Sequence, residues 1–368
     1  MKRFSVLFMN IMVSAALLTC FTNCKKNKDE QTSSGTNYSK IVYLGSTNLS
    51  QARLYTAGGS AGTRILFAGG VDNTHTYFST VDIYDITTRT WSVSQLGEAR
   101  ASAVSASEGN KLFIGGGSLG NNQKSKRVDI YDGTTGGWSS GDLSDGRTDF
   151  AAGSAGGFVA FAGGWSNSGY SDIVDLYNSA KGQWTTCPLS SKRDYPCGTG
   201  CRDKIFFAGG ENGAGLYSDA VDIFNTSTEQ WTIQHLSTKR GRITAEAAGG
   251  KVLFAGGDDK DSIVGVVDIY DMNTSLWSTS RISKTRLFMA GVSVGNLILF
   301  AGGGDGFMIY DVIDIYNVNT GNWSVAKLSF PRVALTAASA GNIVLFAGGV
   351  IDMNWTQITS SVDIFQAE

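Results

Sequence analysis

Hydrophobic residues return along this chain in a short block that ends in small residues. The first block, Ile65–Gly70, reads Ile-Leu-Phe-Ala-Gly-Gly, and six similar blocks surround Phe113, Phe161, Phe207, Phe254, Phe300 and Phe346. Successive Phe positions are 46, 48, 46, 47, 46 and 46 residues apart. Each block is a short continuous apolar run, as expected for a strand buried on both faces. A strand-based period of about 40–50 residues predicts a ring of similar four-stranded sheets.

A second apolar pattern alternates with a polar position and follows each block. It reads apolar–Asp–apolar–aromatic, which places alternate side chains on opposite faces of a strand. Its copies begin at Val81, Val128, Val174, Val221, Val267, Ile313 and Val362. In six copies a Trp comes next, at Trp91, Trp138, Trp184, Trp231, Trp277 and Trp323. An Arg stands before every block, at Arg53, Arg100, Arg147, Arg193, Arg240, Arg286 and Arg332.

This order of Arg, apolar block, Gly-Gly, aromatic and Trp resembles the kelch repeat, and the resemblance covers residues 41–368. It implies an all-β, seven-bladed β-propeller of four-stranded antiparallel blades. The small residues after each Arg suit the innermost strand. Turn pairs such as Gly109-Asn110 and Gly156-Gly157 supply the positive φ of a tight hairpin to the next strand.

The last repeat lacks a Trp after Val362, and the N-terminal segment can supply the missing outer strand. Leu44 lies nine residues before Arg53, which is the spacing of the Trp residues, and Leu49 matches an apolar position four before each Arg. We therefore expect residues 41–49 to complete the last blade. Such closure joins both ends of the domain in one sheet and leaves only short edges exposed.

Residues 1–24 carry the pattern of a secretory signal. Lys2-Arg3 precedes an apolar stretch, Phe4–Leu18, that is shorter than a membrane-spanning helix requires. The Cys residues after it resemble those of a bacterial lipoprotein signal, with Cys24 as the expected lipidation site and Cys20 as the alternative. An ordinary signal peptide with incidental cysteines is the other interpretation.

Residues 25–40 are polar and lack hydrophobic periodicity, so we expect a flexible tether before a domain at 41–368. The charged run Lys28-Asp29-Glu30 resembles the export signals of surface lipoproteins in some Gram-negative bacteria. These features together predict an exported, lipid-anchored protein of the bacterial cell envelope, located at the cell surface, such as that of the outer membrane, or in the periplasm.

Composition narrows the partners. The chain has 30 basic and 32 acidic residues, a net charge of −2 and no basic stripe, which argues against nucleic acid. We expect a monomer without cofactor or metal.

Cys197 and Cys201 fall on one predicted inner strand, where four residues span about 13 Å. A disulfide needs Cα atoms within about 7 Å, so these cysteines and Cys187 are expected to be free thiols.

Comparison of the repeats separates scaffold from function. The Arg and Asp present in every repeat are expected to pair as scaffold, since stranded buried charges are costly; an Arg ring at the channel mouth is the alternative. Tyr77, Tyr170 and Tyr217 occupy a position that holds Ile263, Ile309 and Ile358 in other repeats, so we expect an apolar structural role there.

The position two after each Arg behaves differently, because its residue changes from repeat to repeat. It holds Tyr55, Ser102, Asp149, Tyr195, Arg242, Phe288 and Ala334. The loops between the second and third strands add Trp165, Glu211, Asp258, Asp305 and Trp355, none of which recurs. In kelch-type propellers this end commonly lines the ligand face. Aromatic rings beside carboxylates suit a carbohydrate or a polar peptide; an ordinary solvated rim is the alternative.

Catalytic signals are scarce. The two histidines, His75 and His235, fall in different repeats, which argues against a His-based metal site or a Ser-His-Asp triad. Asp149 and Glu246 on inner strands leave a paired-carboxylate hydrolase open. The sequence favours a binding module that engages a glycan or a protein through its axial face. The alternative is a sugar-acting enzyme, by analogy with kelch-type mutarotases and epimerases, in which Asp149, Arg242 and Glu246 would converge.

Overall fold

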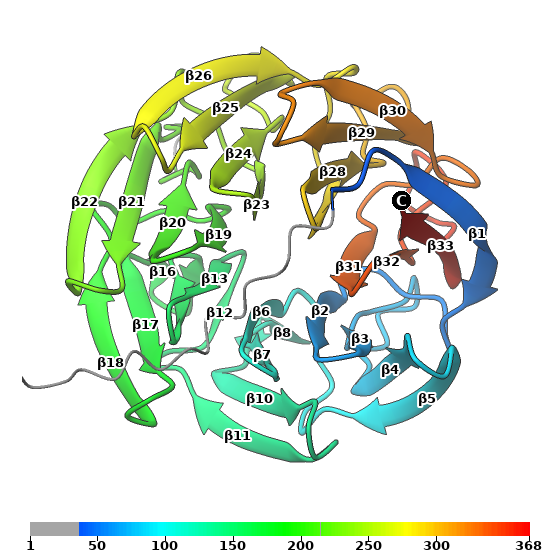
Figure 1. Ribbon diagram of the computed structural model, residues 1–368. Helices are drawn as coiled ribbons and strands as arrows, with labels where there is room; N and C mark the ends of the chain where they lie inside the picture. The colour runs from blue at the N-terminus through cyan, green and yellow to red at the C-terminus, as the bar shows by residue number, and fades with distance from the viewer. Residues whose placement is uncertain (1–36, 214) are drawn as a thin grey trace, which may run out of the picture. The chain divides into compact units, whose positions relative to one another are not determined.

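The computed structural model describes residues 37–213 and 215–368, and all regular structure in them is β (Figure 1). The expected signal segment 1–24, with Cys20 and Cys24, lies outside the described residues, as does most of the expected tether. Residues 38–40 of that tether are bound to the domain: the backbone N–H of Tyr38 donates to Asn296 Oδ1 at 2.6 Å, and that of Ser39 donates to the carbonyl of Glu368 at 2.6 Å.

The described strands form seven four-stranded antiparallel sheets arranged in a ring (Figure 1), which confirms the expected propeller. The innermost strands are β2 (Ala57–Ala61), β6 (Val104–Glu108), β13 (Ala151–Ala155), β19 (Cys197–Cys201), β23 (Thr244–Ala248), β27 (Ala290–Val294) and β31 (Thr336–Ala340). The apolar blocks form β3 (Arg64–Ala68), β7 (Lys111–Gly115), β14 (Phe158–Ala162), β20 (Lys204–Ala208), β24 (Lys251–Ala255), β28 (Leu297–Ala301) and β32 (Ile343–Ala347).

The Asp-containing runs and the Trp residues form the two outer layers. The third strands are β4 (Thr80–Asp85), β10 (Arg127–Asp132), β17 (Ile173–Asn178), β21 (Ala220–Asn225), β25 (Val266–Asp271), β29 (Val312–Asn317) and β33 (Ser361–Ala367). The outermost are β5 (Thr90–Gln95), β11 (Trp138–Asp142), β18 (Gln183–Pro188), β22 (Gln230–His235), β26 (Leu276–Arg281), β30 (Trp323–Lys327) and β1 (Ile41–Asn48). Short strands at one end of the sheets complete the set: β8 (Ser118–Gly120), β9 (Gln123–Lys124), β12 (Arg147–Thr148), β15 (Trp165–Ser166) and β16 (Gly169–Tyr170).

The N-terminal strand closes the last sheet, as the sequence predicts, but its register differs by one residue. β1 pairs with β33, and the blue and red strands lie side by side in Figure 1. A bulge between Tyr43 and Gly45 sets Tyr43, not Leu44, opposite Phe365. The two rings lie 5.3 Å apart, much as Tyr84 and Trp91 do at 5.0 Å. The prediction that Leu44 takes the place of the Trp was therefore wrong, because the bulge inserts one residue that a count of positions cannot reveal.

The core lies between neighbouring sheets. Phe67, Phe161 and Phe254 have no exposed surface, and each belongs to a cluster that joins residues of two adjacent sheets. Each strand of the second layer is thus covered on both faces, which explains why its sequence is continuously apolar rather than alternating.

The repeated Arg and Asp residues pair inside every sheet. The seven Arg side chains are fully buried, and each contacts the Asp of its own third strand, for example Arg240 with Asp268 at 2.8 Å and Arg53 with Asp82 at 2.6 Å. Arg53 also donates to the carbonyl of Phe67. The scaffold interpretation is confirmed, and the Arg ring at the channel mouth is wrong, because these guanidinium groups do not reach the surface.

The three cysteines of the domain are free, as expected. Cys197 and Cys201 are the first and last residues of β19 and are both buried. Burial raises the pKa of the Cys197 thiol to about 12, so it stays in its unreactive protonated form at neutral pH.

Candidate functional site

The seven variable positions share one backbone conformation although they share no side chain. All are left-handed, with φ between 46° and 56°: Tyr55, Ser102, Asp149, Tyr195, Arg242, Phe288 and Ala334. A side chain in this region costs about 1 kcal/mol, and glycine would avoid that cost. No repeat uses glycine there. The turn is needed because it leads the chain from the buried Arg into the innermost strand, and a side chain has been kept at each turn.

These turns lie next to one another around the axis. The backbone N–H of Ser102 donates to the carbonyl of Tyr55 at 2.9 Å, that of Tyr195 to Asp149 at 2.7 Å, and that of Ala334 to Phe288 at 3.1 Å. The seven side chains therefore form a ring, which we call the axial mouth.

The axial mouth surrounds cavities that share lining residues. One of about 470 Å³ is lined by six members of the ring, and an adjoining one of about 200 Å³ by Asp149, Tyr195, Arg242 and Phe288. A third cavity of about 330 Å³ shares Ser102 and Asp149 and extends outward to Lys124 and Trp165. Volumes of this order suit a small ligand or a segment of a larger one.

One side of the mouth is aromatic. Trp355, in the loop before β33, lies 6.2 Å from the ring of Tyr55 in a stacked arrangement and 6.0 Å from Phe288 in an edge-on arrangement. Tyr55 and Trp355 are both exposed. Residues from three sheets thus make one apolar, open wall.

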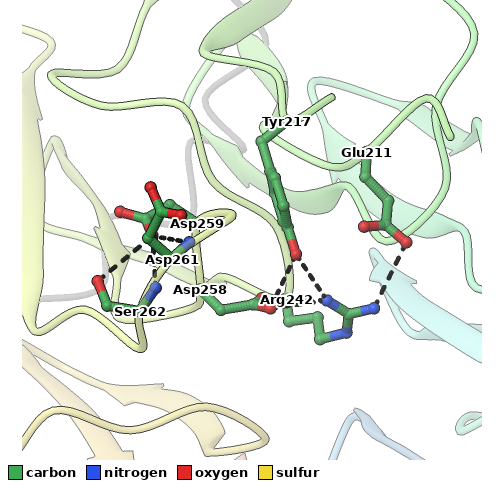
Figure 2. Close-up of polar contacts among 7 residues, drawn as sticks. All are labelled: Glu211, Tyr217, Arg242, Asp258, Asp259, Asp261 and Ser262. Atoms are coloured by element: carbon green, nitrogen blue, oxygen red, sulfur yellow. Dashed lines mark hydrogen bonds and ion pairs between the residues drawn. The ribbon is translucent and has the colours of Figure 1, made fainter. Parts of the chain in front are cut away.

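The other side is charged and centres on Arg242 (Figure 2). Its Nη1 lies 2.8 Å from Asp258 Oδ2, its Nη2 lies 3.5 Å from Glu211 Oε1, and its guanidinium carbon lies 4.6 Å from the ring centre of Tyr195. Tyr217 donates its hydroxyl to Asp258 at 3.0 Å and accepts from Arg242 at 3.4 Å. Burial by itself lowers the pKa of Arg242, but Asp258 and Glu211 stabilise the charged guanidinium and keep the pKa above its ordinary value.

Two further carboxylates lie close to this network without a cation of their own. Burial raises the pKa of Asp194 to about 7, with the charges of Glu211 and Asp149 acting in the same direction. Burial also raises the pKa of Asp149, which hydrogen bonds from Thr148 and Tyr195 and the charge of Arg242 partly offset. Perturbed carboxyl groups in a cleft are typical of functional sites.

The structure brings together most of the site residues that the sequence suggested. Tyr55, Asp149, Tyr195, Arg242 and Phe288 line the mouth, Glu211 and Asp258 hold Arg242, and Trp355 and Trp165 stand at its edges. Asp305 lines none of these cavities: its carboxylate accepts from Tyr310 and from the backbone of its own loop. Asp259 does the same for Asp261 and Ser262 (Figure 2).

Glu246 lies in a different cavity from Asp149. It projects from β23 into the central channel, about 370 Å³, which is otherwise lined by glycine, alanine, serine, threonine and valine from the innermost strands. Burial raises the pKa of Glu246 to about 8. The expected grouping of Asp149, Arg242 and Glu246 in one pocket is not seen, because no cavity is lined by both Asp149 and Glu246 among the described residues.

Sequence comparison missed Asp194 and the role of Tyr217. Asp194 is the only charged residue among those directly after the repeated Arg. Comparison of the seven repeats at this position, one before that of Arg242, therefore identifies it in the same way. Tyr217 occupies a position that is apolar in other repeats, but its hydroxyl joins the Arg242 network. Its structural assignment was therefore incomplete, since a tyrosine ring serves an apolar position while its hydroxyl remains free to bond.

His75 lies on an exposed loop and His235 ends the outer strand β22. Within residues 37–213 and 215–368, no group of three or more His, Cys, Asp and Glu side chains is arranged to hold a metal ion. The same part of the chain contains no helix long and apolar enough to cross a membrane.

A family model described as the Kelch motif matches residues 52–94. That span holds one full repeat, from Arg53 through Val81 to Trp91, and the other sheets repeat its pattern of strands. No curated protein matches this sequence.

Proposed function

We propose that this kelch-repeat protein is a non-catalytic binding module that engages a glycan or a protein segment at its axial mouth. One observation carries the proposal: seven equivalent left-handed turns present seven side chains that differ in chemistry, and all of them line one or both of two adjoining cavities. If the scaffold required a particular side chain at this position, every repeat would carry the same residue, as every repeat carries an Arg two positions earlier. Variation at strained, converging positions is expected where a ligand is recognised.

Exposed apolar side chains at the loop tips favour a protein ligand. Phe307 and Met308 are 89% and 59% exposed, and Met353 and Trp355 are exposed on the next sheet's loop. Large apolar side chains exposed together mark protein interaction sites. They lie on the loops between the second and third strands, which are the loops that contact the mouth through Trp355 and Asp258.

Binding to arrays of glycans and peptides tests this proposal, and each hit is then assayed for chemical change. Tyr195→Ala and Arg242→Ala remove mouth side chains and should abolish binding, whereas Asp261→Asn, an exposed carboxylate in the loop outside the mouth, should not change it. Binding that survives both mouth substitutions would move the site to another face of the molecule.

A sugar-acting enzyme is the second candidate, and the raised pKa of Asp194, about 7, favours it. A carboxyl group that titrates near neutral pH can act as a general acid or base. Turnover of an array hit that is lost in Asp194→Asn or Asp149→Asn would establish the enzyme; turnover lost only in Glu246→Gln would place the chemistry in the channel.

We also propose that the domain is carried at the bacterial cell envelope by a lipid on Cys24. The basic and apolar start of the chain and the polar segment after Cys24 support this. Cys24→Ser should move the protein from the membrane to the soluble fraction, and a shift seen only with Cys20→Ser would relocate the anchor.

A further inference from the structure

Resting on the proposed function, we infer that the axial mouth recognises a basic side chain, a lysine or an arginine, on an extended segment of a partner protein. The cationic end would lie against Asp149, which lines the mouth and interacts with Asp194 through its charge, and the aliphatic stem would run along the aromatic wall of Tyr55, Phe288 and Trp355. Four features of the described residues carry this inference.

The first feature is an excess of negative charge at the mouth. Asp149, Asp194, Glu211 and Asp258 gather around Arg242, so four carboxylates face one guanidinium, an excess of three negative charges when all are ionised. Lys124, on the outer wall of the third cavity, reduces that excess to two. A cleft lined mainly by one sign of charge attracts the opposite sign.

The second feature is that Arg242 is already occupied. Its Nη1 contacts both oxygens of Asp258 at 2.8 and 3.2 Å, its Nη2 contacts Glu211, and its face covers the ring of Tyr195. A ligand carboxylate would have to displace these partners and would meet Asp149 and Asp194 nearby. The network therefore disfavours an anionic ligand, although it contains the guanidinium group of Arg242.

The third feature is a buried carboxylate that lacks a full set of partners. Asp194 is 6% exposed, and its Oδ1 accepts no hydrogen bond within the part of the chain that the structure describes. An unpaired buried carboxylate carries an energetic cost, and a positive charge placed nearby would reduce it. Asp194 lines none of the three cavities of the mouth, so a ligand ammonium or guanidinium group would donate its hydrogen bonds to Asp149 and would act on Asp194 through its charge.

The fourth feature is the aromatic wall opposite these carboxylates. Tyr55 and Trp355 present open faces, and a cation near such a face is attracted to it. A basic side chain also has a long apolar stem that follows an aromatic surface while its charged end reaches deeper.

Proton linkage gives this inference a signature that a simple hydrophobic pocket lacks. The groups that face Asp194 are Glu211, Asp149 and Arg242, with Tyr170 and Tyr195 beside them. A ligand cation lowers the pKa of Asp194, which is about 7 without ligand, so binding releases a proton below that pH. Affinity should then rise as the pH is raised toward about 7 and level off above it.

The experiment uses the whole domain and fluorescent Gly-Ser-X-Ser-Gly peptides that differ only in X: lysine, arginine, acetyllysine, glutamine or glutamate. The lysine and arginine peptides should bind at least about tenfold more tightly than the acetyllysine and glutamate peptides. Asp149→Asn should reduce that preference, and Asp194→Asn should remove the pH dependence. Asp261→Asn is the matched control and should change neither.

Equal or tighter binding of the glutamate or acetyllysine peptide, or no binding of the basic peptides at millimolar concentration, would overturn the inference. A glucosamine tetramer that binds in their place, with loss in Asp149→Asn, would keep the cationic mouth but reject the protein partner. The proposed function fails separately, when array ligands bind but Tyr195→Ala and Arg242→Ala leave them unaffected.

Discussion

Arg240 and Arg242 are two residues apart in the segment that leads into β23, yet they belong to different parts of the molecule. Arg240 is fully buried, pairs with Asp268 and has an equivalent in every repeat. The side chain of Arg242 is 22% exposed, sits on a left-handed turn and has an equivalent in none. Both are arginines paired with aspartate, so residue type does not separate them. Recurrence and backbone conformation do: the first belongs to the scaffold and the second to the mouth.

The broadest test of the scaffold removes a whole piece of it. Deletion of residues 38–50 takes away β1, its pairing with β33 and the buried Ile41 and Leu49. Each buried aliphatic side chain contributes about 1.5–3 kcal/mol and each lost hydrogen bond about 1 kcal/mol, so the free energy of unfolding should fall by at least about 5 kcal/mol. Thermal denaturation measures this, and a truncated protein that melts like the full one would refute closure by β1.

Alanine at each of the two arginines tests the comparison itself. Arg240→Ala leaves Asp268 buried without its partner, which should lower the free energy of unfolding by about 3–5 kcal/mol. Arg242→Ala removes a partly exposed pair and should cost about 1 kcal/mol or less. Urea denaturation of both variants gives the two values. Similar losses at the two positions would erase the distinction between scaffold and mouth.

The fold is more accessible to sequence reasoning than the mouth. The period, the paired Arg and Asp and the apolar block repeat seven times, so each prediction is checked against six others. Tyr43 escaped that check because its bulge occurs only in the last sheet. Tyr217 escaped because its contact with Asp258 on the next sheet depends on loop geometry that spacing along the chain does not encode. Asp194 could have been found without the structure, since it is the only charged residue at its position in the seven repeats.

The pH dependence of stability sharpens the comparison at Asp194. Its raised pKa, about 7, means that the folded protein holds a proton that the unfolded chain has already lost, so stability should fall as the pH rises from about 4 to about 7. Asp194→Asn removes that loss. We expect this variant to be more stable than the parent by up to about 4 kcal/mol at about pH 8 and nearly equal to it near pH 4. Urea denaturation at both pH values, with Asp261→Asn as the control, measures the difference in stability between variant and parent. Equal differences at the two pH values would contradict the raised pKa of Asp194.

The smallest expected effect concerns the strain of the mouth. Ala334 has φ of 53° and the smallest side chain of the ring. Ala334→Gly relieves the left-handed strain and should raise the free energy of unfolding by about 0.5–1 kcal/mol, after the greater entropy of glycine in the unfolded chain is subtracted. Ala338→Gly, on the regular strand β31, should lower it instead. A loss of stability in Ala334→Gly would show that the turn is not strained.

The most direct test of the account maps where a ligand touches the protein. Amide hydrogen exchange is measured with and without the tightest-binding peptide of the array. We predict slower exchange at the turns that form the mouth, residues 55–56, 102–104 and 195–197, and at the loop around Trp355. The outer strands β5 and β11 and the turns at residues 109–110 and 156–157, at the opposite end of the inner strands, should be unchanged. Protection confined to those turns or outer strands would contradict the axial mouth as the binding site.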